Sequence, residues 1–201
     1  MRKIVLFYLF SVFYIVFGKS LSEKNNSNSF CSQKTQLNWA REMGLREDQM
    51  ILTKDQNIQT LFLDRKNWKE LPEAFLCFAQ LEYLHLNAND FKKFPLILLE
   101  LTQLKELWLN QNRLTEIPEE ILQLQKLQIL SITGNQLKKI PNNLCKMPEL
   151  QKVFLTKNEL TKVPTCLLSH PKLKDLDLSS NKINPKSLAN IPTNKRLQVQ
   201  L

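Results

Sequence analysis

The feature that most constrains this chain is a repeat of 23 residues that continues without a slip over most of its length. Residues 104–118 read LKELWLNQNRLTEIP, and related stretches begin at positions 58, 81, 104, 127, 150, 173 and 196. One such unit cannot bury its apolar side alone, so a fixed period of this size is typical of a solenoid. The sequence therefore predicts a row of stacked, similar units.

Within each unit the apolar residues predict a strand followed by a turn. Leu107 and Leu109 are two residues apart, which places both side chains on one face of a β-strand, and we expect that face to point into the solenoid. An asparagine follows where the chain must turn, and a buried asparagine amide can satisfy backbone groups that are cut off from water. We expect this structural role for Asn89, Asn112, Asn135, Asn158 and Asn181.

A proline begins the return segment of most units. Apolar residues three and six positions after Pro118, namely Ile121 and Leu124, fit a short helix or 3₁₀ turn. Proline is tolerated at a helix start because the N–H group that it lacks would have no partner there. We expect such turns after Pro72, Pro95, Pro118, Pro141 and Pro164.

These positions together form the pattern L-x-x-L-x-L-x-x-N-x-L, in which the chain resembles the leucine-rich repeat proteins. The 23-residue form also resembles secreted repeat proteins of spirochaetes, other bacterial repeat proteins and the Ras-group repeat proteins. The resemblance covers residues 58–201, as six repeats plus a final partial strand. It implies an α/β fold, a horseshoe solenoid with a parallel sheet on the concave face and short helical or 3₁₀ turns on the convex face. It further implies a binding scaffold and not an enzyme.

The N-terminal residues 1–20 have the layout of a signal peptide. Arg2 and Lys3 precede apolar residues 4–17, and small residues follow. The apolar run is shorter than the ~20 residues that span a membrane, so we expect no stable transmembrane anchor. The sequence predicts a secreted protein in the extracellular medium, in a periplasm or on an outer cell surface. A transmembrane anchor and lipidation of Cys31 are the alternatives.

Residues 21–57 are expected to form a linker and a helical cap for the first repeat. The stretch SQKTQLNWAREMGL places Leu37, Ala40 and Met43 on one side of a helix, and Gly44 can end it. The following QMILT is a candidate edge strand. Terminal repeats need such caps because their core is otherwise exposed.

The cysteines do not suggest a disulfide framework. Cys77, Cys145 and Cys166 fall at three different positions of the return segment, so we expect their side chains to point in different directions. We therefore expect reduced, partly buried thiols. Cys31 can pair within the cap region.

The sequence offers no convincing catalytic or cofactor site. Cys166 and His170 are four residues apart, as a nucleophile and base could be, but no third group is placed to orient them. His170 takes a position that leucine or methionine holds elsewhere, which predicts a histidine at the rim of the core. His85 belongs to the other surface, so two histidines cannot share a metal ion. We expect no enzyme activity, metal or cofactor.

Lysines recur after the turn and form a possible basic ridge. The chain carries a net charge of +9, and a ridge of this kind could attract acidic glycans or lipid headgroups. The export signal argues against nucleic acid as a partner. The ridge lysines are Lys92, Lys93, Lys138, Lys139 and Lys162.

The residues between the strand leucines predict the contact surface. Trp108 stands between Leu107 and Leu109, so it should point outward on the concave sheet beside residues from neighbouring units. Exposed aromatic clusters often mark contact sites, although cross-strand packing that only stiffens the sheet is the alternative. The expected apolar patch is Phe62, Tyr83, His85, Trp108, Ile129 and Phe154. The expected polar rim is Asp64, Arg65, Asn87, Asn110, Gln111, Thr133, Thr156 and Lys157.

Three functions remain open from the sequence. The favoured one is a secreted, non-enzymatic module that binds a protein through its concave face, with a host protein among the candidate partners. The second is a binder of acidic glycan or a membrane surface through the lysine ridge. The third is a homo-oligomeric, surface-structural protein that pairs through the strand at residues 196–201.

Overall fold

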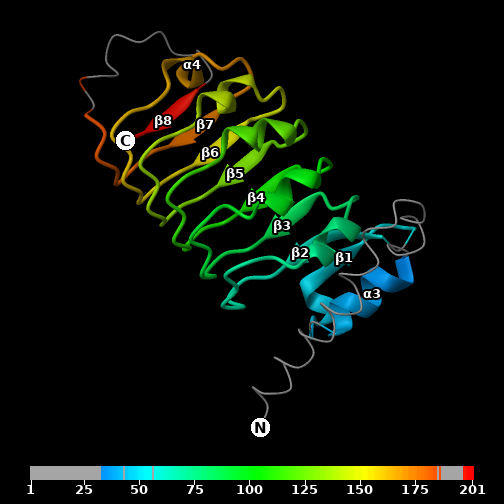
Figure 1. Cartoon of the computed structure of the whole chain (residues 1–201). Helices are drawn as coiled ribbons and strands as arrows, with labels where there is room; N and C mark the ends of the chain where they lie inside the picture. Colours follow the sequence, from blue (N-terminus) through cyan, green and yellow to red (C-terminus); the bar gives the residue numbers. More distant parts are fainter. Residues whose placement is uncertain (1–32, 43, 56, 185, 187–196) are drawn as a thin grey trace.

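The computed structural model describes residues 33–42, 44–55, 57–184, 186 and 197–201. Figure 1 shows a curved row of strands, with short helical turns along one side and α3 beside the first strands. The predictions for residues 1–20, for the following linker and for Cys31 lie outside the described residues. The proposed domain boundaries likewise stay a prediction.

The strands form one open, eight-stranded sheet in chain order. β1 pairs with β2 antiparallel, and every later pairing is parallel. Equivalent positions of successive repeats align, so that Leu84, Leu107 and Leu130 lie side by side. The parallel sheet and its aligned columns are confirmed. The strands are β1 (Met50–Leu52), β2 (Ile58–Phe62), β3 (Tyr83–His85), β4 (Glu106–Trp108), β5 (Ile129–Ser131), β6 (Lys152–Phe154), β7 (Asp175–Asp177) and β8 (Gln198–Gln200).

Short helical turns cover the other face of the core, as predicted. Each of the five begins directly after one of the prolines, which occupies the N-cap position. Four are 3₁₀ turns, and the last is a single α-helical turn. They are η2 (Glu73–Cys77), η3 (Leu96–Glu100), η4 (Glu119–Gln123), η5 (Asn142–Lys146) and α4 (Thr165–Leu168).

The core lies between the sheet and these turns. Leu107 and Leu109 are fully buried, as are Ile121 and Leu124 from the return segment. Burial of each such side chain is worth about 1.5–3 kcal/mol relative to exposure, so stacking of repeats is the main stabilising term. The horseshoe solenoid that the repeat pattern predicts is confirmed.

The first repeat is covered by helix α3 (Gln33–Glu42), followed by η1 (Glu47–Gln49) and β1. Trp39 packs edge-on against Phe75 and Phe78, with ring centroids 5.5 and 5.0 Å away. Ala40 is buried and Leu37 packs against the core as expected, while Met43 lies outside the described residues. Trp39, which was not predicted, widens the buried side of the helix. After the helix Gly44 has φ +67°, and its N–H donates to the carbonyl of Arg41.

The five turn asparagines bridge adjacent repeats. The Nδ2 group of Asn135 donates to the carbonyls of Leu109 (3.0 Å) and Ile132 (3.3 Å), and its Oδ1 accepts from the N–H of Leu114 (2.9 Å). Asn158 makes the equivalent bonds one repeat later. These are the hydrogen bonds expected of a buried turn asparagine.

The residue before each asparagine adopts a left-handed conformation. Only one of these positions is glycine, Gly134, with φ +69°. The others have φ between 54° and 57°; they are Ala88, Gln111, Lys157 and Ser180. Arg65, with φ 57°, holds the equivalent position before Lys66, which replaces the asparagine in the first repeat. Among the residues that the structure describes, no helix has both the length and the apolar composition needed to cross a membrane.

Candidate protein-contact surface

The concave face of the sheet carries a row of side chains from successive strands. Phe62, His85 and Trp108 are register partners on β2, β3 and β4. The same row continues through Ser131 and Phe154 on β5 and β6. All four ring-bearing residues are half-buried, so each presents part of its surface to solvent.

The four rings contact one another in turn across five strands, and two of the three contacts are stacked. The centroids of Phe62 and His85 are 4.7 Å apart, and those of His85 and Trp108 are 5.6 Å apart with ring planes at 5°. Trp108 then reaches past the intervening strand to Phe154, at 6.3 Å and 25°. We call Phe62, His85, Trp108 and Phe154 the aromatic row.

The row is continuous because its middle position holds a small residue. Ser131 is only 2% exposed, which fits a position between the rings of Trp108 and Phe154. Its hydroxyl donates to Oδ1 of Asn110 at 2.7 Å, so this buried polar group is satisfied. The sequence placed Ser131 on the outward face but did not reveal that its neighbours close over it.

Trp108 is held in a fixed orientation. Its Nε1–H donates to Oε2 of Glu106 at 3.1 Å, and its indole lies between His85 and Phe154. A side chain that is already ordered loses little further conformational freedom on binding. The arrangement therefore provides a pre-organised apolar surface.

The second outward row runs parallel to the aromatic row. Tyr83, Glu106 and Ile129 are register partners and half-buried. Thr60, which the strand pattern also places outward, is only 5% exposed. Tyr83 and Ile129 thus lie on the concave face with the aromatic row, at the positions expected of them.

The polar rim residues also hold the turns together. Oδ1 of Asp64 accepts the N–H of Asn87 at 2.6 Å, and Oδ1 of Asn87 accepts the N–H of Asn110 at 2.9 Å. Oδ1 of Asn110 accepts the N–H of Thr133 at 2.7 Å. Asp64, Asn87 and Asn110 occupy the same position in successive repeats, and this recurrence in the sequence could have revealed the series of hydrogen bonds. Lys157, by contrast, is exposed.

The aromatic row favours a neutral histidine. Burial lowers the pKa of His85 from its ordinary value, and the carboxylates of Asp64 and Glu106 oppose this effect only in part. A neutral imidazole between Phe62 and Trp108 extends the apolar character of the row at neutral pH.

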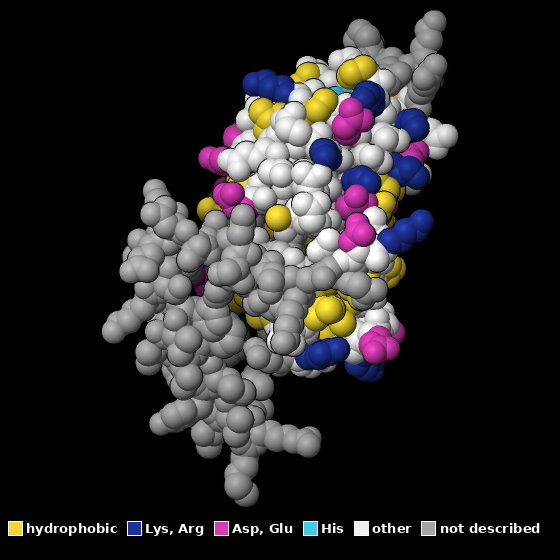
Figure 2. All heavy atoms as spheres, turned by 90° about the vertical axis from the view of Figure 1, so that its right-hand side faces the viewer, with side chains coloured by type: hydrophobic (Ala, Val, Ile, Leu, Met, Phe, Trp, Pro, Cys, Tyr) yellow, Lys and Arg dark blue, Asp and Glu magenta, His cyan; other side chains and the backbone are white. Residues whose placement is uncertain are grey.

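The predicted lysine ridge is exposed but interrupted. Lys92 and Lys93 occupy the same repeat positions as Lys138 and Lys139, yet the intervening repeat has Glu116 there. Figure 2 shows side chains of both charges interspersed along one side of the solenoid. A continuous basic surface is therefore not formed by these residues.

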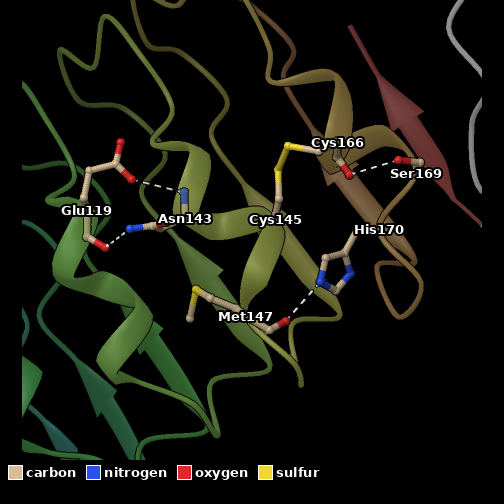
Figure 3. Close-up of a disulfide and its surroundings, with 7 residues drawn as sticks. All are labelled: Glu119, Asn143, Cys145, Met147, Cys166, Ser169 and His170. Carbon is tan, nitrogen blue, oxygen red and sulfur yellow. Dashed lines mark hydrogen bonds between the residues drawn. A yellow bond between two sulfur atoms is a disulfide. The ribbon is translucent and has the colours of Figure 1, made fainter.

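The expectation that Cys145 and Cys166 stay reduced is wrong. They form a disulfide between η5 and α4, with Cα atoms 5.7 Å apart (Figure 3). The two positions are 21 residues apart, whereas Asn143 of η5 hydrogen-bonds to Glu119 of η4 at a separation of 24, so contacts between neighbouring convex turns do not follow the 23-residue period. Cys77 is also disulfide-bonded.

This disulfide removes Cys166 as a nucleophile, and His170 has a structural role. His170 is buried, and its Nε2 lies 3.0 Å from the carbonyl oxygen of Met147 (Figure 3). Its Nδ1 accepts from the N–H of Leu173 at 3.1 Å. The second contact makes Nε2 the protonated nitrogen. The described residues contain no cluster of three or more potential metal ligands.

Comparisons with known proteins agree with this architecture. Residues 102–160 match the family model described as leucine rich repeat. No curated protein sequence matches the chain.

Solved structures with the same fold come from bacteria and plants. A leucine-rich repeat protein of Leptospira interrogans is 25% identical over 66% of this chain and 46% of its own, with a TM-score of 0.50. Internalin C2 of Listeria monocytogenes is 24% identical over 75% and 66%, with a TM-score of 0.58.

A plant receptor adds a complex with a bound factor. The ectodomain of the membrane receptor kinase GASSHO1/SCHENGEN3 of Arabidopsis thaliana, in complex with CASPARIAN STRIP INTEGRITY FACTOR 2, is 26% identical. The match covers 68% of this chain and 18% of that protein, with a TM-score of 0.55. The chain thus spans between 18% and 66% of the length of these three proteins.

Proposed function

Because the chain is a leucine-rich repeat protein, we propose that it is a secreted, non-enzymatic module that holds a protein partner against its concave sheet. The observation that carries the proposal is the aromatic row, which continues across five strands with Trp108 at its centre. Trp108 and Tyr83 are the proposed anchors, with Ile129 beside them.

The chemistry of these residues supports a protein partner. Tryptophan and tyrosine bury a large area with few rotatable bonds, and truncation of such anchors typically costs 2 kcal/mol or more of binding free energy, about 30-fold in affinity. The hydrogen bond between Trp108 and Glu106 fixes the indole before any partner arrives. If these rings served only to stiffen the sheet by packing across strands, they would not need to stay partly exposed to solvent.

Two observations support secretion. The Cys145–Cys166 disulfide fits an oxidising compartment such as the periplasm or the extracellular space, where such bonds persist. The receptor kinase structure is of an ectodomain, which is an extracellular part of a membrane receptor. That ectodomain is in complex with a factor, which also favours a ligand-binding role for this chain.

The test is capture of partners by the wild type and by a Trp108→Ala, Tyr83→Ala double variant. Both proteins are immobilised, exposed to host and self extracts, and compared by quantitative mass spectrometry. We expect a partner enriched on the wild type to be lost at least tenfold on the double variant. The matched control is Leu96→Ala, which truncates an apolar side chain that is 62% exposed on the convex face.

Retention of the partner at full strength by the folded double variant would end this proposal. A glycan or lipid surface bound through the lysine ridge gives a different pattern. In that case binding falls steeply with salt and is unchanged in the double variant, because exposed charges are screened over about 10 Å at 0.1 M ionic strength.

A further inference from the structure

The aromatic row ends at a carboxylate. The register partner of Phe154 on the next strand is Asp177 of β7. The aromatic row is therefore followed, directly beside Phe154, by the carboxylate side chain of Asp177. Asp175, two residues earlier, points to the same face of the sheet.

The sign of charge on this face is opposite to that of the whole chain. The outward positions of β2–β7 carry Glu106, Asp175 and Asp177 against Lys152 alone, a net charge of −2. The rim residues Asp64, Arg65 and Lys157 reduce it to −1. The whole chain carries +9. Lys152 forms an ion pair with Asp175 at 3.5 Å, so its charge offsets that of Asp175 and not those of Asp177 and Glu106. The concave face thus complements a basic partner.

We propose that the partner places an arginine beside Phe154, with its guanidinium group over Asp177 as the next member of the stack. This inference rests on the proposed concave-face binding. A guanidinium is planar, stacks on aromatic rings and forks onto a carboxylate, whereas an ammonium is a point charge that cannot continue a stack. The partner segment is therefore basic, with apolar side chains that lie along the aromatic row.

Asp177 is already fixed in an ionised form. Its Oδ1 accepts the backbone N–H of Ser179 at 2.9 Å and the hydroxyl of the same residue at 2.6 Å. Burial alone raises the pKa of Asp177, but hydrogen bonds from Ser179 and Thr156 outweigh it and hold the pKa below its ordinary value. The guanidinium would thus meet a carboxylate that is charged throughout the neutral range.

The probes are three blocked pentapeptides that differ only in charge chemistry: Leu-Arg-Leu-Arg-Leu, Leu-Lys-Leu-Lys-Leu and Leu-Glu-Leu-Glu-Leu. Each is titrated into the full chain while NMR follows the indole N–H of Trp108 and the backbone amides of Phe154 and Asp177. We expect the arginine peptide to bind at least threefold more tightly than the lysine peptide. We expect the glutamate peptide to cause no shift.

The diagnostic variant is Asp177→Asn. An asparagine oxygen can still accept the hydrogen bonds of Ser179, so the turn is retained while the charge is lost. We expect the arginine and lysine peptides then to bind equally and more weakly. The matched control is Glu159→Gln, which removes the same charge from a turn position where Glu159 pairs with Lys182 at 3.4 Å. We expect it to leave the arginine preference unchanged.

The outcomes separate this inference from the proposed function. Equal binding of the arginine and lysine peptides to the wild type, or an unchanged preference in Asp177→Asn, overturns the arginine site but leaves binding at Trp108 intact. Shifts that avoid Trp108, Phe154 and Asp177 altogether, or no shifts with any peptide, overturn it as well. The proposed function is tested separately, by whether the Trp108→Ala, Tyr83→Ala double variant loses partner capture.

Discussion

The concave and convex faces of this solenoid join neighbouring repeats with different spacings. On the sheet, residues 23 positions apart are partners, as with Leu107 and Leu130. On the convex side the disulfide joins residues 21 positions apart, Cys145 and Cys166. The turns η4 and η5 are joined at a separation of 24, by hydrogen bonds between Glu119 and Asn143. Strands therefore pair in one register, whereas contacts between successive turns have more than one spacing, so a position within the repeat identifies its neighbours directly only on the sheet.

The turn asparagines reach two different positions of the preceding repeat. Oδ1 of Asn135 accepts the N–H of Leu114, 21 residues earlier, while its Nδ2 donates to the carbonyl of Leu109, 26 residues earlier. Each amide thus bonds to two places in the preceding repeat. The asparagine column therefore ties each repeat to the preceding one both at the end of the strand and in the loop that follows it.

Asn135→Ala should have the largest effect on stability, a loss of about 3 kcal/mol. The buried N–H of Leu114 loses its acceptor, at a cost of about 1–3 kcal/mol, and the carbonyls of Leu109 and Ile132 each lose one of two asparagine donors. Urea unfolding followed by circular dichroism measures the change. Asn142→Ala, at an exposed position of η5, is the control and should change stability by less than about 0.5 kcal/mol. Equal midpoints for the two variants would contradict the bridging role.

A Cys145→Ser, Cys166→Ser double variant should lose about 2 kcal/mol. A cross-link that closes a loop of this length is worth roughly 3 kcal/mol by restricting the unfolded chain, and measured values often fall below that figure. Thermal unfolding compares this variant with Lys146→Ser, an exposed neighbour on η5. An unchanged midpoint would mean that the turns keep their offset without the disulfide.

The period made most of the fold predictable. Leu107 and Leu109 had to face inward and Trp108 outward because strand side chains alternate, and the fixed spacing fixed the register. The disulfide was not predictable in this way, because contacts between convex turns do not follow the 23-residue period. Trp39 was missed because a short helix of mixed composition permits more than one apolar side.

The contact surface was predictable only as a set of positions. The columns place Trp108 and Phe154 on the same face, but their stacking depends on side-chain torsions and on the small size of Ser131. The polar rim was read as a contact edge, whereas Asp64, Asn87 and Asn110 also hold backbone N–H groups of the next repeat. Whether these residues contact a partner stays a prediction.

Gly134→Ala should cost about 1 kcal/mol at the corner where the two faces meet. Gly134 has φ +69°, where an L-residue is disfavoured by roughly 1–2 kcal/mol. Steric overlap does not contribute, because an added Cβ would lie 3.7 Å from its nearest neighbour, Gln111. Ala88→Gly, at the equivalent position with φ +54°, should be neutral or stabilising. Urea melts of both variants test the pair, and a stabilised Gly134→Ala would contradict this explanation.

The smallest expected effect is a pH dependence that comes from the aromatic row. Burial lowers the pKa of His85 in the folded chain, so the unfolded chain binds a proton first as pH falls through the ordinary value of 6.5. Stability is therefore unaffected above that value, decreases as pH falls from it towards the folded pKa, and then levels off. The effect is small because the ring is only half-buried and the carboxylates of Asp64 and Glu106 oppose it. Urea midpoints at pH 7.5 and pH 5, compared between the wild type and His85→Gln, isolate this contribution. A larger loss of stability on acidification in His85→Gln than in the wild type would show that the row stabilises the charged imidazole instead.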